Sequence, residues 1–312
     1  DRYIDFRVST FPTPLGEKAA VRVLDPTTGV KSIDGLGLEG RNAELVREGL
    51  ARPFGTILLT GPTGSGKTTT LYALLQELNK VDVNIVSLED PVEYFVAGVN
   101  QSQVQPEIGY DFASGLRQIL RQDPDVILVG EIRDRETAGL AIHAALTGHI
   151  VLSTLHTNNA VGAIPRLIDM KVEPFLLPST LTMVIAQRLV SRLCDACKKK
   201  GEAPPPIQNV IKKALAGLPA GVTGGYKEPY VIYRAPGCAE CRDRGTKGRI
   251  GLFEVLKMSP ALEEIVMREP TASRLSAQAK QEAMVSLRQD GIVKALQGLV
   301  SVEEVVRETE DA

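Results

Sequence analysis

The sequence is poor in the features that membrane-spanning and nucleic-acid-binding proteins need. Tryptophan is absent and aromatic residues make up only 4% of the chain, which leaves few side chains on which single-stranded bases can stack. The formal net charge is −2 and no basic run exceeds a few residues, so charge alone favours neither nucleic acid nor a membrane surface as a partner. No apolar stretch approaches the roughly 20 residues of a membrane span. The composition therefore favours a globular protein that does not bind nucleic acid.

The chain also lacks an initiator methionine and a signal peptide. It begins DRYIDFRVST, which alternates apolar and polar residues like a strand already under way, so we expect that the natural protein has a further region before it. Because nothing indicates export, we expect a cytoplasmic protein whose four cysteines are reduced. The 312 residues are enough for about two domains.

Apolar runs typical of buried strands occur in the first half of the chain. TILLT, NIVSL, DVILVG and HIVLSTL alternate with helical patterns, as in a parallel sheet covered by helices on both faces. The helix after the first run has leucines at helical spacing. Residues 1–35 predict two strands joined by a turn, and residues 36–52 predict a short helical connector. The fold class is therefore α/β.

The last part of the chain has a different character. Residues 198–237 are rich in proline and glycine and predict an irregular insertion. After Gly251 the pattern is helical to the end, and SVEE at Ser301 is a capping-box signature for the last helix. We divide the chain into four parts: the end of a β-rich domain with its linker (1–50), an α/β core (51–190), a cysteine-containing subdomain (191–250) and a C-terminal helical region (251–312).

One stretch, GPTGSGKT, matches the phosphate-loop pattern G-x-x-x-x-G-K-[ST]. It follows a predicted strand and opens a predicted helix, whose N-terminus attracts phosphate. Lys67 is expected to reach the β- and γ-phosphates of ATP, and the Thr68 hydroxyl to bind Mg²⁺. This context disfavours the alternative of a glycine-rich turn with an incidental lysine. The predicted nucleotide-binding residues here are Gly61, Pro62, Thr63, Gly64, Ser65, Gly66, Lys67, Thr68 and Thr69.

Carboxylates and a histidine follow the predicted buried strands. Glu89 directly follows the run NIVSL, and Glu131 follows DVILVG. The carboxyl ends of parallel strands meet where ligands bind in open α/β sheets. In isolation each is an ordinary strand-end acid, but beside a phosphate loop a role in hydrolysis is favoured. The three histidines, His143, His149 and His156, lack the spacing of a helical zinc site. The run IVLSTL is expected to carry His156 to the phosphates.

All four cysteines occur in two CxxC pairs, Cys194 with Cys197 and Cys238 with Cys241. Two such pairs predict a tetrahedral Zn²⁺ site, which would hold together the segment rich in proline and glycine. Because four protein ligands close the site, the metal is expected to be structural. The alternatives are redox-active thiols and plain buried cysteines.

Four motifs occur in a fixed order: GPTGSGKTTTLY, SLEDPVEY, LRQILRQDPDVILVGEIRD and ALTGHIVLSTLHTNNA. From Arg7 to the C-terminus, the chain resembles the traffic ATPases of bacterial type II secretion and type IV pilus assembly. The resemblance implies a RecA-like core that forms a hexameric ring. It also implies an ATP-hydrolysing motor at the cytoplasmic face of the inner membrane, bound there through platform proteins. The tetracysteine element implies assembly or secretion, because the retraction ATPases typically lack it.

The resemblance also assigns roles to residues of the motifs. The first acid of LEDP, here Glu89, is implied to activate the attacking water. Glu131 takes the Walker B place near Mg²⁺, where a glutamate instead of the usual aspartate suggests contact through a metal-bound water. His149 and His156 fill the histidine box and are expected to sense the γ-phosphate.

Arginines are the remaining candidates, because charge shifts onto the phosphoryl oxygens during hydrolysis. Arg7 and Arg22 match the family's candidates for action across a subunit boundary. Arg117 and Arg121 lie one helical turn apart and are expected to share a cleft, and Arg249 is a further match. For each of them an ordinary exposed arginine is the alternative.

Three other functions stay open at this point. Pilus retraction is the alternative within the family. A RecA-like nucleic-acid motor is a second, against which the near-neutral charge and low aromatic content count. The third is a nucleotide-binding scaffold that does not hydrolyse ATP, in which Glu89 and Glu131 have no catalytic role.

Overall fold

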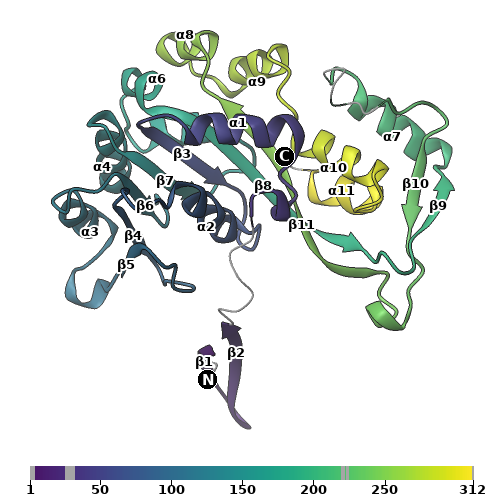
Figure 1. The fold of residues 1–312 in the computed structure, drawn as a ribbon, viewed down its shortest axis with the longest axis horizontal. Helices are drawn as coiled ribbons and strands as arrows, with labels where there is room; N and C mark the ends of the chain where they lie inside the picture. The colour runs from purple at the N-terminus through teal and green to yellow at the C-terminus, as the bar shows by residue number, and fades with distance from the viewer. Residues whose placement is uncertain (1–3, 25–31, 219–221, 223–224, 311–312) are drawn as a thin grey trace.

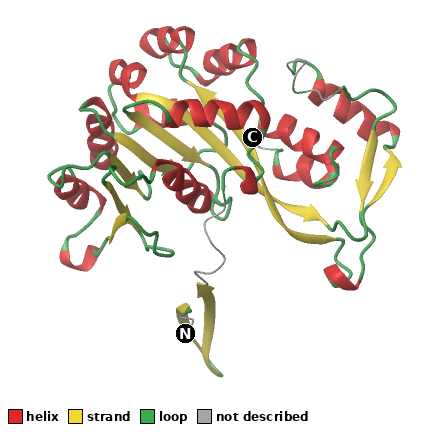
Figure 2. Cartoon of the chain, viewed as in Figure 1, coloured by secondary structure: helices red, strands yellow, loops and turns green. Residues whose placement is uncertain are grey.

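A computed structural model describes residues 4–24, 32–218, 222 and 225–310. Its centre is a seven-stranded sheet with helices packed on both faces (Figures 1 and 2). From one edge to the other the strands are β11 (Thr246–Lys257), β8 (Leu181–Leu193), β3 (Gly55–Thr60), β7 (Ile150–Leu155), β6 (Val126–Val129), β4 (Ile85–Glu89) and β5 (Val99–Gln103).

The four apolar runs form β3, β4, β6 and β7, and each pairs in parallel with its neighbours in the sheet. The crossover helices α2 (Lys67–Leu78), α3 (Phe112–Ile119) and α4 (Arg135–Leu146) lie between them in the chain. The predicted α/β fold with a parallel sheet is therefore confirmed. Because the strands run in the same direction, their carboxyl ends meet at one edge.

Two apolar cores lie on opposite faces of the sheet. In β3, Leu58 belongs to one core, whereas Ile57 and Leu59 belong to the other, as the two-residue period of a strand requires. The predicted connector forms the helix α1 (Gly40–Leu50), whose Val46 is fully buried. This helix packs with α2 on the face that carries Ile57.

The strands β8 and β11 extend the sheet beyond the four predicted strands. β8 pairs in parallel with β3, and β11 lies antiparallel on its outer side. The expectation of a wholly helical chain after Gly251 is wrong for residues 251–257, because this buried apolar run pairs with β8. β8 also crosses the predicted boundary at residue 190, so one strand belongs to both the core and the cysteine-containing segment.

The segment expected to be an irregular insertion is in fact partly regular. It contains β9 (Lys199–Glu202), the helix α7 (Pro205–Leu215) and β10 (Val231–Arg234), and β9 pairs antiparallel with β10. Prolines are compatible with the first turn of a helix, where no intrahelical N–H bond is lost. Ile211 of α7 is fully buried, so apolar packing orders this segment.

The predicted helical end of the chain is observed. Ser301 caps the last helix by accepting a hydrogen bond from Glu304 N at 3.2 Å. The Glu304 carboxylate instead accepts Ser191 N at 2.7 Å, so it ties this helix to the end of β8. The helices here are α8 (Pro260–Arg268), α9 (Ala272–Gln281), α10 (Leu287–Leu296) and α11 (Val302–Glu308).

The remaining strands and α-helices lie outside the central sheet. At the N-terminus, β1 (Asp5–Thr13) and β2 (Gly16–Leu24) form an antiparallel sheet of their own, as predicted. The helices α5 (Ala163–Asp169) and α6 (Leu177–Thr180) lie between β7 and β8 in the chain. Within the described ranges, no helix has both the length and the hydropathy that crossing a bilayer requires.

Candidate nucleotide site

The phosphate loop joins β3 to α2, and three of its positions require glycine for conformational or steric reasons. Gly64 and Gly66 have φ angles of +82° and +89°, which glycine adopts without steric cost. A Cβ on Gly61 would lie 2.4 Å from the Gln187 carbonyl oxygen. The loop can therefore turn tightly onto the N-terminus of α2, where free N–H groups and the helix dipole favour an anion.

The Lys67 side chain folds back over this loop. Its Nζ donates hydrogen bonds to the carbonyl oxygens of Gly61 at 2.8 Å and Pro62 at 3.1 Å. Burial lowers the pKa of Lys67, Glu131 opposes this shift, and Arg188 adds to it. The ammonium is thus placed over the loop, where phosphate oxygens can replace the two carbonyl oxygens.

Glu131 and His156 meet at the carboxyl ends of the adjacent strands β6 and β7. His156 Nε2 lies 3.2 Å from one oxygen of Glu131, and Arg133 donates to the other at 2.6 Å. The hydrogen bond with Glu131 raises the pKa of Arg133. Arg133 was missed in the sequence, although its place two residues after Glu131 in GEIRD was a usable signal.

Glu89 is held differently, inside a cage of neutral donors. Only 3% of this residue is exposed. Its carboxylate accepts hydrogen bonds from the hydroxyl of Tyr72, from Ser87 Oγ at 2.6 Å and from Gln101 Nε2 at 3.2 Å. Burial, together with the nearby carboxylate, raises the pKa of Tyr72 and raises that of Tyr94 to about 12. Sequence reasoning found Glu89 but none of its donors.

The two histidines of the predicted histidine box lie at opposite ends of β7. His156 follows the carboxyl end, whereas His149 precedes the amino end and its Nδ1 lies 2.8 Å from the carbonyl oxygen of Ala144. A strand of six residues places these ends about 20 Å apart. The expectation that both histidines reach one phosphate therefore needs correction, since a single chain brings only His156 to this edge.

Among the described side chains, none of the predicted arginines lies bonded to the phosphate loop. The guanidinium of Arg117 is paired with Glu136, and Arg7, Arg121 and Arg249 are exposed. Within the described part of the chain, no hydrogen bond or ion pair joins any of these four to the loop. The backbone of Arg22 lies opposite Arg7 in the N-terminal hairpin, but its side chain lies outside the described residues.

Two neighbouring polar residues of β8 support the site and were missed in the sequence. Gln187 Oε1 accepts Thr70 Oγ1 of α2 at 2.8 Å, and Arg188 donates to the carbonyl oxygen of Asn158 at 2.8 Å, just after His156. Both are buried. The pair QR inside an apolar strand, LTMVIAQRLV, was the signal, because buried polar side chains need partners.

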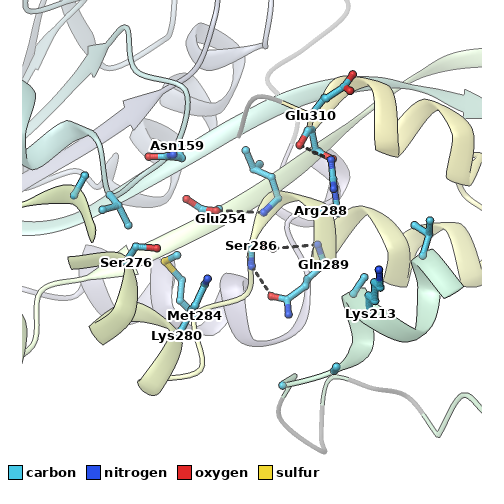
Figure 3. A pocket seen from close by; sticks show the side chains of 18 residues that line it. Asn159, Lys213, Glu254, Ser276, Lys280, Met284, Ser286, Arg288, Gln289 and Glu310 are labelled. Carbon is cyan, nitrogen blue, oxygen red and sulfur yellow. Dashed lines mark hydrogen bonds between the residues drawn. The ribbon is translucent and has the colours of Figure 1, made fainter. Parts of the chain in front are cut away.

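A cavity of about 1000 Å³ lies elsewhere, between α7, α9 and α10 (Figure 3). Lys213, Lys280 and Arg288 contribute positive charge to its wall, and Glu254 and Glu310 contribute negative charge. Arg288 is already engaged, because it donates to Thr309 Oγ1 and to the Thr309 carbonyl oxygen. The cavity shares no residue with the phosphate loop and is not part of the nucleotide site.

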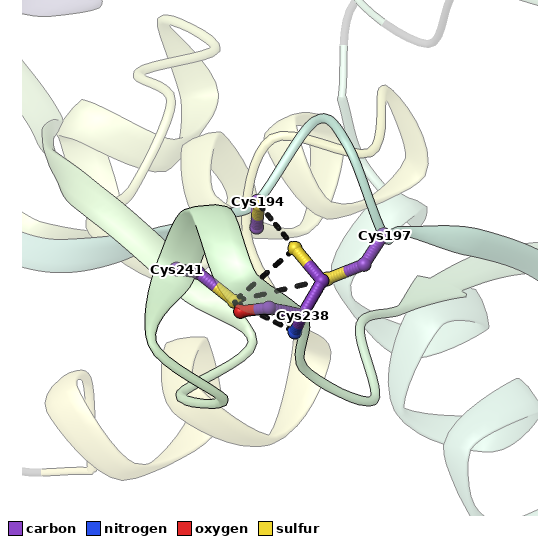
Figure 4. A group of neighbouring side chains, drawn as sticks. All are labelled: Cys194, Cys197, Cys238 and Cys241. Carbon is purple, nitrogen blue, oxygen red and sulfur yellow. Dashed lines mark hydrogen bonds between the residues drawn. The ribbon is translucent and has the colours of Figure 1, made fainter.

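The four cysteines, from two distant parts of the chain, converge (Figure 4). Their sulfur atoms all lie within 4.8 Å of one another, and three of the separations are 3.7, 3.9 and 4.0 Å. Tetrahedral zinc–thiolate bonds require about 3.8 Å between sulfurs. Cys241 Sγ also accepts the backbone N–H groups of Cys238 and Gly245, which stabilise a thiolate. The cluster therefore fits a metal ion such as Zn²⁺.

The family of this chain follows from its similarity to known proteins. A sequence profile of the family described as "Type II/IV secretion system protein" matches residues 1–307. The chain belongs to this family.

The chain is 46% identical, over 98% of its length, to the "Type IV pilus assembly ATPase PilB" of Myxococcus xanthus, and covers 53% of that protein. It is also 46% identical, over 100% of its length, to the "Type II secretion system ATPase E" of Vibrio cholerae, and covers 59% of it. It thus spans little more than half the length of these family members.

Among solved structures, the pilus retraction motor PilT with bound ADP is similar, with a TM-score of 0.69 and 29% identity. The alignment covers 98% of this chain and 74% of that one. The resemblance to secretion and pilus ATPases, inferred from four motifs, is confirmed as family membership. The α/β fold of the chain is thus shared with a solved structure of this kind of ATPase.

We predict that Cys241→Ser releases bound zinc, because a tetrahedral site loses one of its four thiolates. Elemental analysis should fall from about one zinc per chain to well below one, and the midpoint of thermal unfolding should drop by roughly 5 °C or more. Glu240→Gln, an exposed change in the same turn, is the control and should alter neither. Zinc absent from metal-replete wild-type protein would contradict the assignment.

We predict that Gln187→Ala destabilises the fold by about 1–3 kcal/mol, because the buried Thr70 hydroxyl loses its acceptor. Urea unfolding measures this loss. In the background of Thr70→Ala the same change should cost clearly less, because the hydrogen bond is already absent. Equal costs in both backgrounds would show that this hydrogen bond does not support α2.

Proposed function

We propose that this chain is the motor part of an ATPase that hydrolyses Mg-ATP and powers assembly of type IV pili or of type II secretion pseudopili. The main support for the proposal is the position of four groups at one edge of the sheet. The phosphate loop leads into α2 there, Glu89 is the last residue of β4, and Glu131 and His156 follow β6 and β7. The names of the relatives PilB and ATPase E support the biological role.

In the proposed site the triphosphate binds at the N-terminus of α2. Lys67 exchanges the carbonyl oxygens of Gly61 and Pro62 for phosphate oxygens. The Thr68 hydroxyl and Glu131 are the groups that would hold Mg²⁺, Glu131 through a water. The metal would neutralise charge on the phosphates. Arg133 and His156 fix the orientation of the Glu131 carboxylate.

Hydrolysis then needs a proton acceptor and additional positive charge. Glu89 is the proposed acceptor for the proton of the attacking water, and His156 the proposed sensor of the γ-phosphate. His149 lies at the far edge of the sheet and is left out of this site. Within one chain no hydrogen bond or ion pair joins Arg7, or any of the other predicted arginines whose side chains are described, to the phosphate loop. This supports a role for Arg7 and Arg22 across a subunit boundary in a homo-hexameric ring. Arg117, Arg121 and Arg249 are secondary candidates for the same role.

Two observations support assembly or secretion over retraction. One is the tetracysteine cluster, and the other is that the chain is more similar in sequence to PilB and ATPase E than to PilT. We propose that the ring works at the cytoplasmic face of the inner membrane, against platform proteins of a pilus or secretion system. The net charge of −2 argues against the alternative of a nucleic-acid motor, and stimulation of ATP turnover by DNA would revive it.

We predict that Glu89→Gln lowers steady-state ATP turnover by about 100-fold or more, because an amide cannot accept the proton. Binding of a fluorescent ATP analogue should be retained. Lys67→Ala should instead lose the binding itself. Glu93→Gln, a half-buried acid four residues away, is the matched control. Near-normal phosphate release by the Glu89 variant would remove Glu89 as the base.

We predict that Arg22 acts in trans, so Arg22→Ala and Lys67→Ala rings should each be inactive but should complement each other when mixed. In randomly mixed rings about a quarter of the interfaces join an intact phosphate loop to a neighbour with an intact Arg22, because ring contacts are heterologous. ATP turnover should recover to about that fraction. Lys18→Ala, in the same strand of the hairpin, is the control with unchanged turnover. Mixed rings that stay inactive would exclude the trans role.

A further inference from the structure

The carboxylate of Glu89 has an unusual set of partners for a buried acid. Buried carboxylates generally pair with a cation or a metal. In the described part of the chain, the groups that bond this carboxylate are all neutral: the hydroxyls of Tyr72 and Ser87 and the amide of Gln101. They come from three elements, α2, β4 and β5. Three neutral donors from separate elements therefore surround the carboxylate of this one acid.

The cage leaves one place for a further donor. A carboxylate has about four lone-pair sites. Oε1 receives Ser87 and Gln101, and Oε2 receives Tyr72. Among the described residues no other donor reaches Oε2, so one of its acceptor sites is left beside the tyrosine hydroxyl. A water activated by Glu89 has to bind at this site, so the direction of its approach is set by Tyr72.

Tyr72 is itself fixed on the helix that begins with Lys67. Its side chain is fully buried, and its ring packs edge-on against Tyr94 with centroids 4.5 Å apart. Its hydroxyl lies 3.4 Å from the backbone N of Glu93. The helix that positions the phosphate-binding lysine thus also positions the hydroxyl that orients the acid.

We propose that Tyr72, assisted by Ser87 and Gln101, is a positioning residue for ATP hydrolysis that acts through Glu89. It holds the carboxylate so that the free site of Oε2 receives the attacking water, and it couples that orientation to α2. The inference rests on the proposed role of Glu89 as the base.

The test is Tyr72→Phe, which removes the hydroxyl and keeps the ring. We expect kcat for ATP to fall about 10- to 100-fold, as for loss of a hydrogen bond to a charged group, with KM changed less than about threefold. Tyr94→Phe is the matched control: it removes the hydroxyl of the packed neighbour and should leave kcat within about twofold. Thermal unfolding checks that all variants are folded. If Tyr72→Phe does not fold, Ser87→Ala removes a donor to Oε1 and should lower kcat in the same way.

A double-variant comparison separates positioning from a merely structural role. In the Glu89→Gln background, Tyr72→Phe should cost no further turnover, because it acts only through the missing carboxylate. A full kcat in Tyr72→Phe, or the same fold-loss in both backgrounds, would overturn the positioning role while leaving the base intact. Normal turnover of Glu89→Gln alone would instead overturn the base, and this inference with it.

Discussion

The parallel hydrogen-bond ladder through β3, β7, β6 and β4 is the constraint on which the candidate site depends. It aligns Thr60 with Leu155, and Val129 with both Ser153 and Leu88. The groups that follow or end these strands consequently converge at one edge. A slip of one residue would turn every side chain of a strand to the opposite face. Two separate apolar cores, one on each face, hold the register, because such a slip would move the side chains of each core into the other, where the packing differs.

The strand β8 connects this edge to the rest of the chain. Gln187 and Arg188 hold α2 and the loop after His156. Six residues after Arg188, the strand has ended and Cys194 enters the sulfur cluster. Between them, Ser191 N is bound by the last helix through Glu304. The nucleotide edge, the cysteine cluster and the C-terminal helices are therefore supported by one continuous strand.

Buried charges join the C-terminal helices to the sheet. Burial raises the pKa of Glu254, whose carboxylate accepts the backbone N–H groups of Ala160 and Leu287. Burial likewise raises the pKa of Asp290, and the Lys294 ammonium 2.5 Å away opposes this shift. Removing one partner of such a buried pair costs about 3–5 kcal/mol. Glu254 is bonded to Leu287, Asp290 accepts Phe253 N, and Lys294 donates to the Gly251 carbonyl oxygen, so these buried charges fix α10 against β11.

The sequence by itself determined the phosphate loop, the strand-end acids, the paired cysteines and the parallel core. Each of these features depends on residues a few positions apart, and their spacing or backbone conformation is compatible with few structures. Only the tertiary structure decided that His149 and His156 lie at opposite ends of β7 and that β11 pairs with β8. It also decided that Tyr72 donates a hydrogen bond to the buried carboxylate of Glu89. Those outcomes rest on contacts between distant residues, such as Thr70 with Gln187, 117 positions apart. Local pattern carries no information on which distant side chain will complete a buried group's hydrogen bonds.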